Sequence, residues 1–481
     1  MPERNVFQTA MPDGLGFPRR VWFIGFAGHR EIADRAAAKE AIARELAIVR
    51  KTLPGEAIGI ASAAAGADLL FLQACREAGL KTVVLLPFAK ERFRADFDND
   101  DEWQAACYEI EMAWWSEVTP GGEEAPAAYH VVAREGLEIS DRMLFLWDGK
   151  EARGLGGTAE TLKEAVARKI PSRVIDSTTL HASWKITPPS SPIVAADEDL
   201  PPARDVRELF EKLDHRAAHF APRSRWFAAG SMSLNHSATV FQAFLVALLM
   251  AAEEVGTFVK FLMVTIATLL PWVGGKFRWQ ERWVRDRVRA ELLRSLLCSH
   301  EPGSPLHSPA LELFGREKVF LRTAAMQLVK ERRGWEAARD EYLTARVDGQ
   351  IAYLTSKGEL AAKWLGRFRK AFWIASWGAI ISGGYIFTTA YLHSRLHLRW
   401  DGPLNFFAVG LPSVAAWCLA MISVFEFKRR AALYSQLVEE LQRLRAKVAG
   451  AYSASAVTHA MHQVERLLLN ELWEWQGSRR K

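Results

Sequence analysis

Two long stretches without a charged residue constrain the fold of this chain more than any other feature. Residues 371–392 and residues 403–425 contain no Asp, Glu, Lys or Arg. A helix needs about 20 predominantly apolar residues to cross a hydrocarbon core of about 30 Å, and both stretches are longer than that. The sequence therefore predicts two membrane-spanning helices in the last quarter of the chain.

A third apolar region, residues 236–275, is interrupted near its middle by Glu253 and Glu254. As a single helix it would extend about 60 Å, twice the thickness of the membrane core. It would also bury two carboxylates at a cost of roughly 2.5 to 3.5 kcal/mol each. A hairpin with arms at 237–252 and 255–273 avoids both problems and brings the predicted number of spans to four. The alternative is a soluble, buried helical hairpin.

Basic residues predict the orientation of these spans. With four spans, the clusters that flank the two hairpins all fall on one side of the membrane, which the positive-inside rule identifies as the cytoplasmic side. We therefore expect a multi-pass protein of the cell inner membrane whose N-terminal and C-terminal regions are cytoplasmic. The clusters consist of Arg223, Arg225, Lys276, Arg278, Arg282, Arg367, Arg369, Lys370, Lys428, Arg429 and Arg430.

The first 175 residues alternate short apolar runs with helical stretches, which is typical of an α/β domain with a parallel sheet. Strands are expected at 21–26, 57–61, 82–86, 143–147 and 173–175. The balance of 62 basic to 56 acidic residues is mild, so no nucleic-acid partner is predicted. The four cysteines show no metal-binding spacing, which favours a reducing compartment without a metal site.

A glycine-rich loop follows the strand expected at 143–147. Glycine allows backbone amides to approach a ligand closely, and a helix predicted over 158–168 would place its positive N-terminus beside them. Gly154, Gly156 and Gly157 are therefore predicted to turn their amides toward a phosphate group, with Thr158 and Glu160 in the first turn of the helix. An ordinary strand-to-helix turn is the alternative interpretation.

Polar residues also follow the other expected strands. Ligands of open α/β sheets bind outside the carboxyl ends of the strands, so these segments are expected to converge on one crevice. Arg30 is the best candidate for phosphate, because a guanidinium makes paired hydrogen bonds to it. The glycines could instead serve tight turns, Asp68 a helix start, and Asp148 either a turn or a ribose hydroxyl. The predicted ligand-binding set is Gly25, Gly28, His29, Arg30, Ser62, Gly66, Asp68, Asp148, Gly156, Gly157, Thr158 and Glu160.

Five ordered motifs, GFAGHR, ASAAAGADLL, LLPFAKERF, LFLWDG and GLGGTAE, resemble the SLOG superfamily, which is related to the DprA and LOG proteins and to the N-terminal domains of melastatin-type channels. The resemblance implies a Rossmann-like domain that binds a nucleotide or a nucleotide-derived signal. LOG enzymes cleave nucleotide glycosidic bonds and carry a second acid where this chain has Thr161. Arg153 and Leu155 also depart from their loop pattern. These departures favour a ligand sensor over an enzyme, so no catalytic residue is assigned and no cofactor is expected beyond the nucleotide-derived ligand.

The second half, with its hairpins and the motif RWQERWVRDRVRAELLRSLL, resembles the SLATT group. These are two-span effector domains that accompany SLOG sensors in bacterial conflict systems, whereas four spans are predicted here. Together the resemblances imply a membrane-bound, homo-oligomeric defence effector in which ligand binding triggers pore formation or membrane disruption. The alternatives are a membrane-tethered glycosidase or phosphohydrolase, with Glu160 or Asp148 as general acid or base, and a scaffold with a vestigial sensor.

The expected domain organisation follows from these assignments. A Pro- and Ser-rich change of composition separates the nucleotide-binding domain from the membrane part. The expected segments are an N-terminal tail (1–19), the SLOG-like domain (20–177), a linker (178–206), the first hairpin with an amphipathic helix (207–300), a cytoplasmic helical segment (301–370), the second hairpin (371–427) and cytoplasmic C-terminal helices (428–481).

Overall fold

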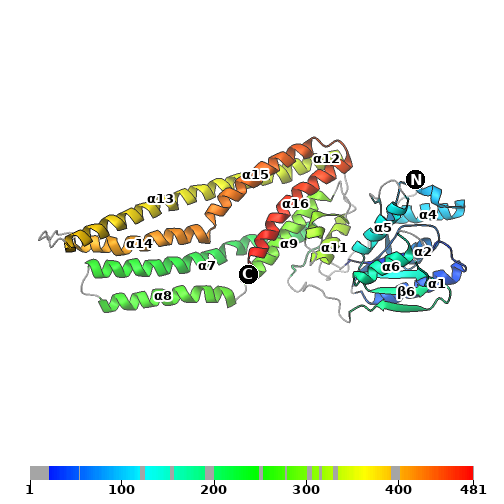
Figure 1. Cartoon of the computed structure of the whole chain (residues 1–481), viewed down its shortest axis with the longest axis horizontal. Coiled ribbons are helices and arrows are strands. Elements are labelled where there is room, and N and C mark those ends of the chain that lie inside the picture. Colours follow the sequence, from blue (N-terminus) through cyan, green and yellow to red (C-terminus); the bar gives the residue numbers. More distant parts are fainter. Residues whose placement is uncertain are drawn as a thin grey trace. The chain divides into compact units, whose positions relative to one another are not determined.

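The computed structural model of the chain divides into two compact units (Figure 1). The α/β unit comprises Met1–Leu209 and Gly303–Arg332, and the helical unit comprises Phe210–Pro302 and Arg333–Lys481. The structure describes residues 21–53, 55–119, 125–151, 156–189, 200–248, 253–276, 279–300, 306–313, 317–328, 334–391 and 401–479.

The α/β unit is built on a seven-stranded sheet with the order β4-β3-β2-β1-β5-β6-β7. All neighbouring strands are parallel except β6 and β7, which are antiparallel. The parallel α/β architecture expected from the sequence is therefore present. The strands are β1 (Val21–Gly28), β2 (Glu56–Ala61), β3 (Lys81–Leu86), β4 (Trp115–Val118), β5 (Arg142–Trp147), β6 (Ser172–Asp176) and β7 (Ala182–Ile186).

Two of these strands were not expected from the sequence. β4 has only four residues and pairs with β3 at one edge of the sheet. β7 lies within the stretch 178–206 that was expected to be a linker, and it pairs with β6 at the other edge. Both are edge strands with few buried apolar residues, so neither carries the continuous apolar run of a central parallel strand. Residues 190–199 of the expected linker lie outside the described residues.

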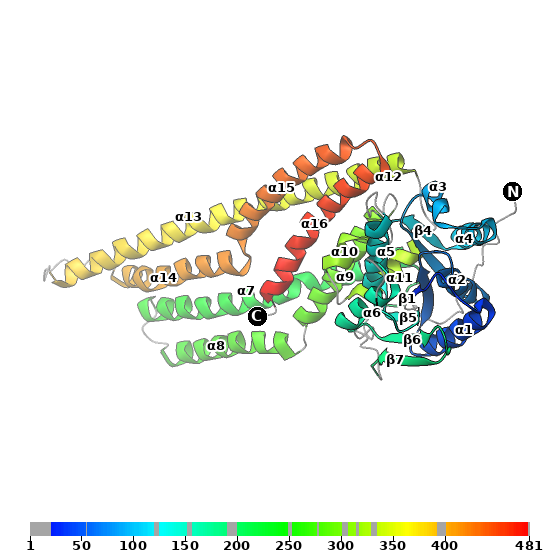
Figure 2. The same ribbon diagram turned by 45° about the vertical axis from the view of Figure 1, so that its right-hand side comes forward.

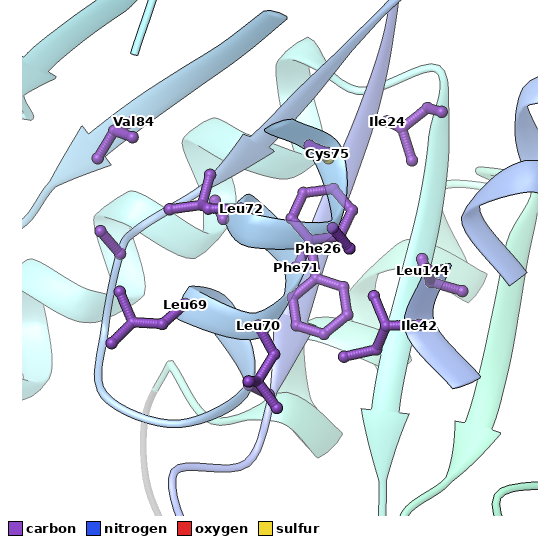
Figure 3. Close-up of a cluster of buried hydrophobic side chains, with 14 of the residues drawn as sticks. Ile24, Phe26, Ile42, Leu69, Leu70, Phe71, Leu72, Cys75, Val84 and Leu144 are labelled. Carbon is purple, nitrogen blue, oxygen red and sulfur yellow. The ribbon is translucent and has the colours of Figure 1, made fainter. Parts of the chain in front are cut away.

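Helices cover both faces of the sheet because every central strand is apolar on both sides. In β1, Ile24 and Phe26 belong to the core that packs against the helices after β1 and β2, and the ring of Phe26 stacks on Phe71 at 4.6 Å (Figure 3). Val21 and Phe23 lie in the core on the opposite face. The helices that follow these strands are α1 (Arg35–Lys51), α2 (Ala67–Glu77), α3 (Lys90–Phe93), α4 (Asp100–Met112), α5 (Ala125–Ile139) and α6 (Thr158–Ala167).

A short segment from the second half of the sequence completes the α/β unit. It contains α10 (Pro309–Leu313) and α11 (Lys318–Leu328), and α11 contacts β1 (Figure 2). The guanidinium of Arg322 is 1% exposed and donates to both carboxylate oxygens of Asp141 at 2.7 and 2.8 Å, as well as to the carbonyl of Ile139. The sequence placed this segment with the cytoplasmic helices of 301–370. An ion pair between residues 181 positions apart leaves no local pattern that would have indicated otherwise.

The helical unit contains eight α-helices and a π-helical segment among its described residues. They are α7 (Val206–Leu248), α8 (Glu253–Lys276), α9 (Trp279–Ser299), α12 (Trp335–Glu341), the π-helical η5 (Tyr342–Asp348), α13 (Gly349–Tyr391), α14 (Asp401–Val424), α15 (Phe427–Ala449) and α16 (Ala454–Arg479). The long helices α7, α8, α13 and α14 lie alongside one another in Figures 1 and 2. Glu426, with a φ of +54°, separates α14 from α15.

Three helices of this unit are long and apolar enough to cross a membrane. The apolar windows lie at Gly256–Val273, within Trp335–Thr389 and within Pro403–Ala449. The expected arm at 237–252 is not among them, so the described residues show three candidate spans rather than four. α7 ends at Leu248, so the described helix contains only residues 237–248 of the expected arm. Residues 249–252 lie outside the described residues.

A buried ion pair lies where α9, η5, α15 and α16 meet. Glu465 is fully buried, and its carboxylate accepts hydrogen bonds from Arg346 Nε and Nη2 at 3.0 and 2.9 Å. The hydroxyl of Tyr342 donates to the same carboxylate at 2.8 Å. The apolar side chains around them come from the same elements, which makes this a polar network inside a helical core: Leu343, Val347, Leu437, Leu441, Val457, Met461 and Val464.

Candidate functional site

A cavity of about 580 Å³ lies at the carboxyl ends of the parallel strands of the α/β unit. Its walls come from the segments that follow β1, β2, β5 and β6 and from one side of α5. β1 pairs with β2 on one side and with β5 on the other, so the strand order changes direction at β1. This is the position at which open α/β sheets bind their ligands, and the volume is that of a small-molecule site.

The structure brings most of the predicted residues to this cavity. The cavity is lined by Gly25, Gly28, His29, Arg30, Ser62, Asp68, Asp148, Gly156, Gly157 and Thr158. Gly66 and Glu160, which were also predicted to bind the ligand, do not line it. Residues 152–155, which include the first glycine of the loop, lie outside the described residues.

Gly66 holds two loops together. Its φ of +89° is a conformation that L-residues rarely adopt, and a Cβ at this position would lie 2.1 Å from the carbonyl oxygen of Arg30. The next residue donates its amide to the carbonyl of His29 at 3.0 Å. Gly66 therefore fixes the segment that carries His29 and Arg30 against the N-terminus of α2.

Replacing Gly66 with alanine is expected to lower the free energy of unfolding by about 1 to 3 kcal/mol, because the backbone conformation is strained and the new Cβ meets a backbone oxygen. Gly79 is a matched control, since its φ is +69° and a Cβ there would meet nothing within 4 Å. Gly79→Ala should cost about 1 kcal/mol at most. Thermal unfolding of the purified chain measures both, and equal losses would show that the contact with Arg30 is unimportant.

Glu160 occupies part of the predicted phosphate cradle. Its Oε2 accepts a hydrogen bond from the amide of Gly156 at 2.5 Å and lies 3.7 Å from Nδ1 of His130. Gly156 itself has a φ of +77°, and a Cβ there would lie 2.7 Å from the backbone nitrogen of His130. Glu160 thus satisfies an amide that a phosphate oxygen would otherwise use. The N-terminal turn of α6 still presents Gly157 and Thr158 to the cavity.

Ser62 and Asp68 form a hydrogen-bonded pair inside the cavity. The hydroxyl of Ser62 donates to Asp68 Oδ2 at 2.5 Å, and its amide donates to the same oxygen at 3.3 Å. Burial nevertheless raises the pKa of Asp68 from its ordinary value of 3.8 to about 6. This carboxyl group therefore changes charge close to neutral pH, which is unusual for an aspartate.

The stability of the α/β unit is expected to depend on Asp68 and pH. Because the folded state binds the proton more tightly than the unfolded state, the contribution of this group rises as the pH falls from 7 to 5, by about 1 kcal/mol. Asp68→Asn removes a titrating group and should flatten this part of the profile. Thermal unfolding of both chains between pH 7.5 and 5 measures the difference, and identical profiles would contradict the assignment.

His29 and Asp148 connect the ends of β1 and β5. The amide of Asp148 donates to Nε2 of His29 at 3.0 Å, and Oδ1 of Asp148 lies 3.1 Å from the same nitrogen. The amide of Lys150 also donates to this carboxylate, which lowers the pKa of Asp148 below its ordinary value. Asp148 is therefore an ionised acceptor at neutral pH, as a group that binds ribose hydroxyls would be.

Arg30 is exposed at the rim of the cavity and lies over the ring of Tyr129, 5.1 Å from its centroid. The hydroxyl of Tyr129 donates to Asp96. Tyr129, Val132 and Gly136 all belong to α5, and sequence reasoning missed them because β4, the strand that this helix follows, was not expected. Their spacing of three and four residues marks one helical face, which a core helix shows equally.

No protein-family model matches this sequence, and no curated protein matches it significantly. Among the described residues, no group of three or more His, Cys, Asp or Glu side chains has the arrangement of a metal site. The cavity offers an arginine, a helix N-terminus, an ionised acceptor and an aromatic ring, which are the groups that phosphate, ribose and a base require.

Proposed function

We propose that this protein is a membrane-bound sensor in which a nucleotide-derived ligand binds the cavity of the α/β unit and thereby controls the membrane helices. One observation carries the proposal: the cavity lies at the point where the strand order reverses, and Arg30 and the N-terminus of α6 both border it. The same chain carries three helices that are apolar and long enough to cross a membrane.

The groups in the cavity suit the parts of a nucleotide. Arg30 and the amides of Gly157 and Thr158 are suited to phosphate oxygens, and Asp148 is suited to ribose hydroxyls. The guanidinium of Arg30 lies over the ring of Tyr129, and a flat base could stack on this ring once Arg30 turns to the phosphate. Because Glu160 satisfies the amide of Gly156, the proposal assigns the phosphate chiefly to Arg30 and to the first turn of α6.

Helix α5 connects the cavity with the segment that returns from the second half of the sequence. Val132 lines the cavity and also belongs to the core that includes Leu306 and Met326. Along the chain, that segment leads back to α9 in one direction and to α12 in the other. On this proposal the membrane helices exist in a resting and an active arrangement. A ligand can shift the equilibrium between them only by its differential affinity for the two states, and a change from 1:99 to 99:1 requires about 5.5 kcal/mol. An oligomer with several sites meets that requirement more readily than one chain.

The packing of α7 supports a fourth span. Its residues follow the apolar window of α14 in antiparallel order: Trp226 contacts Phe425, Ser233 accepts from Trp417 Nε1 at 2.9 Å, and Phe244 contacts Phe406. A helix from 226 to 244 extends about 27 Å, close to the thickness of the membrane core. We therefore include α7 among the spans, with Ser233 and His236 bonded to α14 rather than exposed to lipid.

The resemblance to SLOG sensors and SLATT effectors supports a role in prokaryotic defence. On that proposal the chain is an inner-membrane homo-oligomer with cytoplasmic N-terminal and C-terminal regions. The cavity then faces the compartment in which nucleotide signals are made. Binding opens a pore or disrupts the bilayer.

Replacing Arg30 with alanine is expected to weaken nucleotide binding at least about tenfold, because one bidentate contact to phosphate is lost. Arg50, at the end of α1, is a matched control that does not line the cavity. The measurement is calorimetric titration of the full chain in detergent with mononucleotides and dinucleotides. Equal affinity of the Arg30→Ala and Arg50→Ala variants for every nucleotide would contradict the proposed site.

A second candidate function is nucleotide hydrolysis, which one observation favours. Asp68 has a pKa of about 6 and lies in the cavity, as a general acid or base would. The carboxylates of Glu160 and Asp148 accept hydrogen bonds from the amides of Gly156 and Lys150, which suits ligand positioning better than proton transfer. Incubating the full chain with the same nucleotides separates the two functions, because turnover that is lost in Asp68→Asn would establish the enzyme.

A further inference from the structure

The outer face of α7 differs from the outer faces of the other long helices. α8, α13 and α14 expose large apolar side chains, such as Phe261 at 68%, Ile381 at 69% and Val409 at 57%. α7 also exposes Trp226, Met232 and Phe244. Between Met232 and Phe244, however, it exposes Asn235 and Thr239, and Gln242 lies half-buried close to them. Their spacings of four and three residues put these side chains on one face of the helix.

This polar face borders α8, because Ser231 lies four residues before Asn235 and donates to the carbonyl of Ala267 in α8. Ser233 and His236, on another side of α7, bond to α14. The side-chain amides of Asn235 and Gln242 have no hydrogen-bond partner among the residues that the structure describes. The hydroxyl of Thr239 donates to the carbonyl of Asn235 at 3.4 Å, within its own helix.

Lipid is an unsuitable neighbour for such a face. A polar group without a partner in hydrocarbon costs several kcal/mol. Asn235 lies beyond Ser233 and before Phe244, two residues that contact the apolar window of α14, so it falls at the depth of the membrane core. Water meets the needs of these amides, whereas acyl chains do not.

A charged residue in α8 also requires water or protein rather than lipid as its neighbour. Lys260 is the one charged residue within the window Gly256–Val273. It lies one turn from Gly256, whose position packs against Leu245 of α7, so Lys260 lies on the side of α8 that faces α7. Ionisable residues within spans face water or protein rather than lipid.

We propose that the face of α7 formed by Asn235, Thr239 and Gln242 lines a water-filled path for small ions, created where copies of this chain meet in the membrane. The proposal rests on the proposed function, because it requires α7 to be inserted and the chain to assemble. When the α7 helices of several copies surround a common axis, water along that axis hydrates these side chains. The apolar faces of α8, α13 and α14 then face lipid.

Cysteine accessibility tests this path in the full chain reconstituted into phospholipid vesicles. Asn235→Cys and Thr239→Cys are compared with Ile381→Cys, an exposed position on the apolar face of α13, each measured above the labelling of the four native cysteines. The probe is a membrane-impermeant, positively charged methanethiosulfonate. Thiols ionise and react only in contact with water, so the two α7 variants should react at least about tenfold faster than the α13 variant.

Equal, slow labelling at all three positions would overturn the proposal. So would efficient disulfide cross-linking of Asn235→Cys between copies without labelling, because the polar face would then bind a second copy directly. These outcomes are separate from the nucleotide measurements. Nucleotide-triggered leakage without labelling of α7 would refute only the path, and labelling without any response to nucleotides would refute only the sensor.

Discussion

Replacing Arg322 with alanine is expected to lower the free energy of unfolding of the α/β unit by about 3 kcal/mol, because it leaves the half-buried carboxylate of Asp141 without its ion-pair partner. The Arg322 side chain is 1% exposed, and its guanidinium bonds both oxygens of Asp141. Asp141 also accepts the amide of Phe23 at 2.9 Å, at the start of the central strand β1. The loss should appear in thermal unfolding and in faster proteolysis between residues 303 and 332.

The matched control for Arg322 is Arg168→Ala. Arg168 pairs with Glu164 on the surface of α6, and such pairs contribute less than about 0.5 kcal/mol. The double variant Arg322→Met with Asp141→Asn should recover part of the loss, since no unpaired charge stays buried. If Arg322→Ala costs no more than Arg168→Ala, the segment 303–332 is not an integral part of the α/β unit.

The second large effect is expected at Arg346. Removing its guanidinium by Arg346→Ala leaves the fully buried carboxylate of Glu465 with Tyr342 as its remaining hydrogen-bond donor among the residues that the structure describes. We expect a loss of about 3 to 5 kcal/mol in the helical unit, for the same reason as at Arg322. Unfolding of the full chain in detergent, followed by the helical circular dichroism signal, measures it.

Arg443→Ala provides the comparison at this site, because Arg443 pairs with Glu439 and Glu440 on the exposed face of α15. Its removal should cost less than about 1 kcal/mol. The double variant Arg346→Met with Glu465→Leu should be closer to the parent chain than Arg346→Ala is. Similar losses for Arg346→Ala and Arg443→Ala would show that the buried network contributes little.

The parts of the fold that rest on local patterns could be predicted from the sequence. Long apolar runs such as those ending near Phe26 and Leu86 identified the central strands, and the uncharged stretches identified the apolar parts of α13 and α14. The edge strands β4 and β7 escaped prediction because an edge strand needs no continuous apolar run. The placement of α10 and α11 depends on Arg322 and Asp141, which meet only in the folded chain.

In the candidate site, too, the residues of local motifs could be predicted, whereas those placed by tertiary packing could not. Residues immediately after strands, such as Arg30 and Asp148, were predicted to converge and do line one cavity. Tyr129 was missed because α5 follows β4, a strand that was not expected, and reaches the site through tertiary packing. Gly66 and Glu160 were predicted to touch the ligand, but the structure places one against the carbonyl of Arg30 and the other on the amide of Gly156. A glycine or an acid in a loop shows that backbone geometry or charge matters there without showing which partner requires it.

Nucleotide-dependent leakage tests the central proposal most directly. The full chain is reconstituted into vesicles that contain a fluorescent dye, and dye release is measured with mono-, di- and cyclic nucleotides of each base. At least one nucleotide should raise the rate of release about tenfold or more in the parent chain, and Arg30→Ala should abolish the response at the same concentration while inserting normally. Release that ignores every nucleotide, or that is unchanged in Arg30→Ala, would contradict the proposed function.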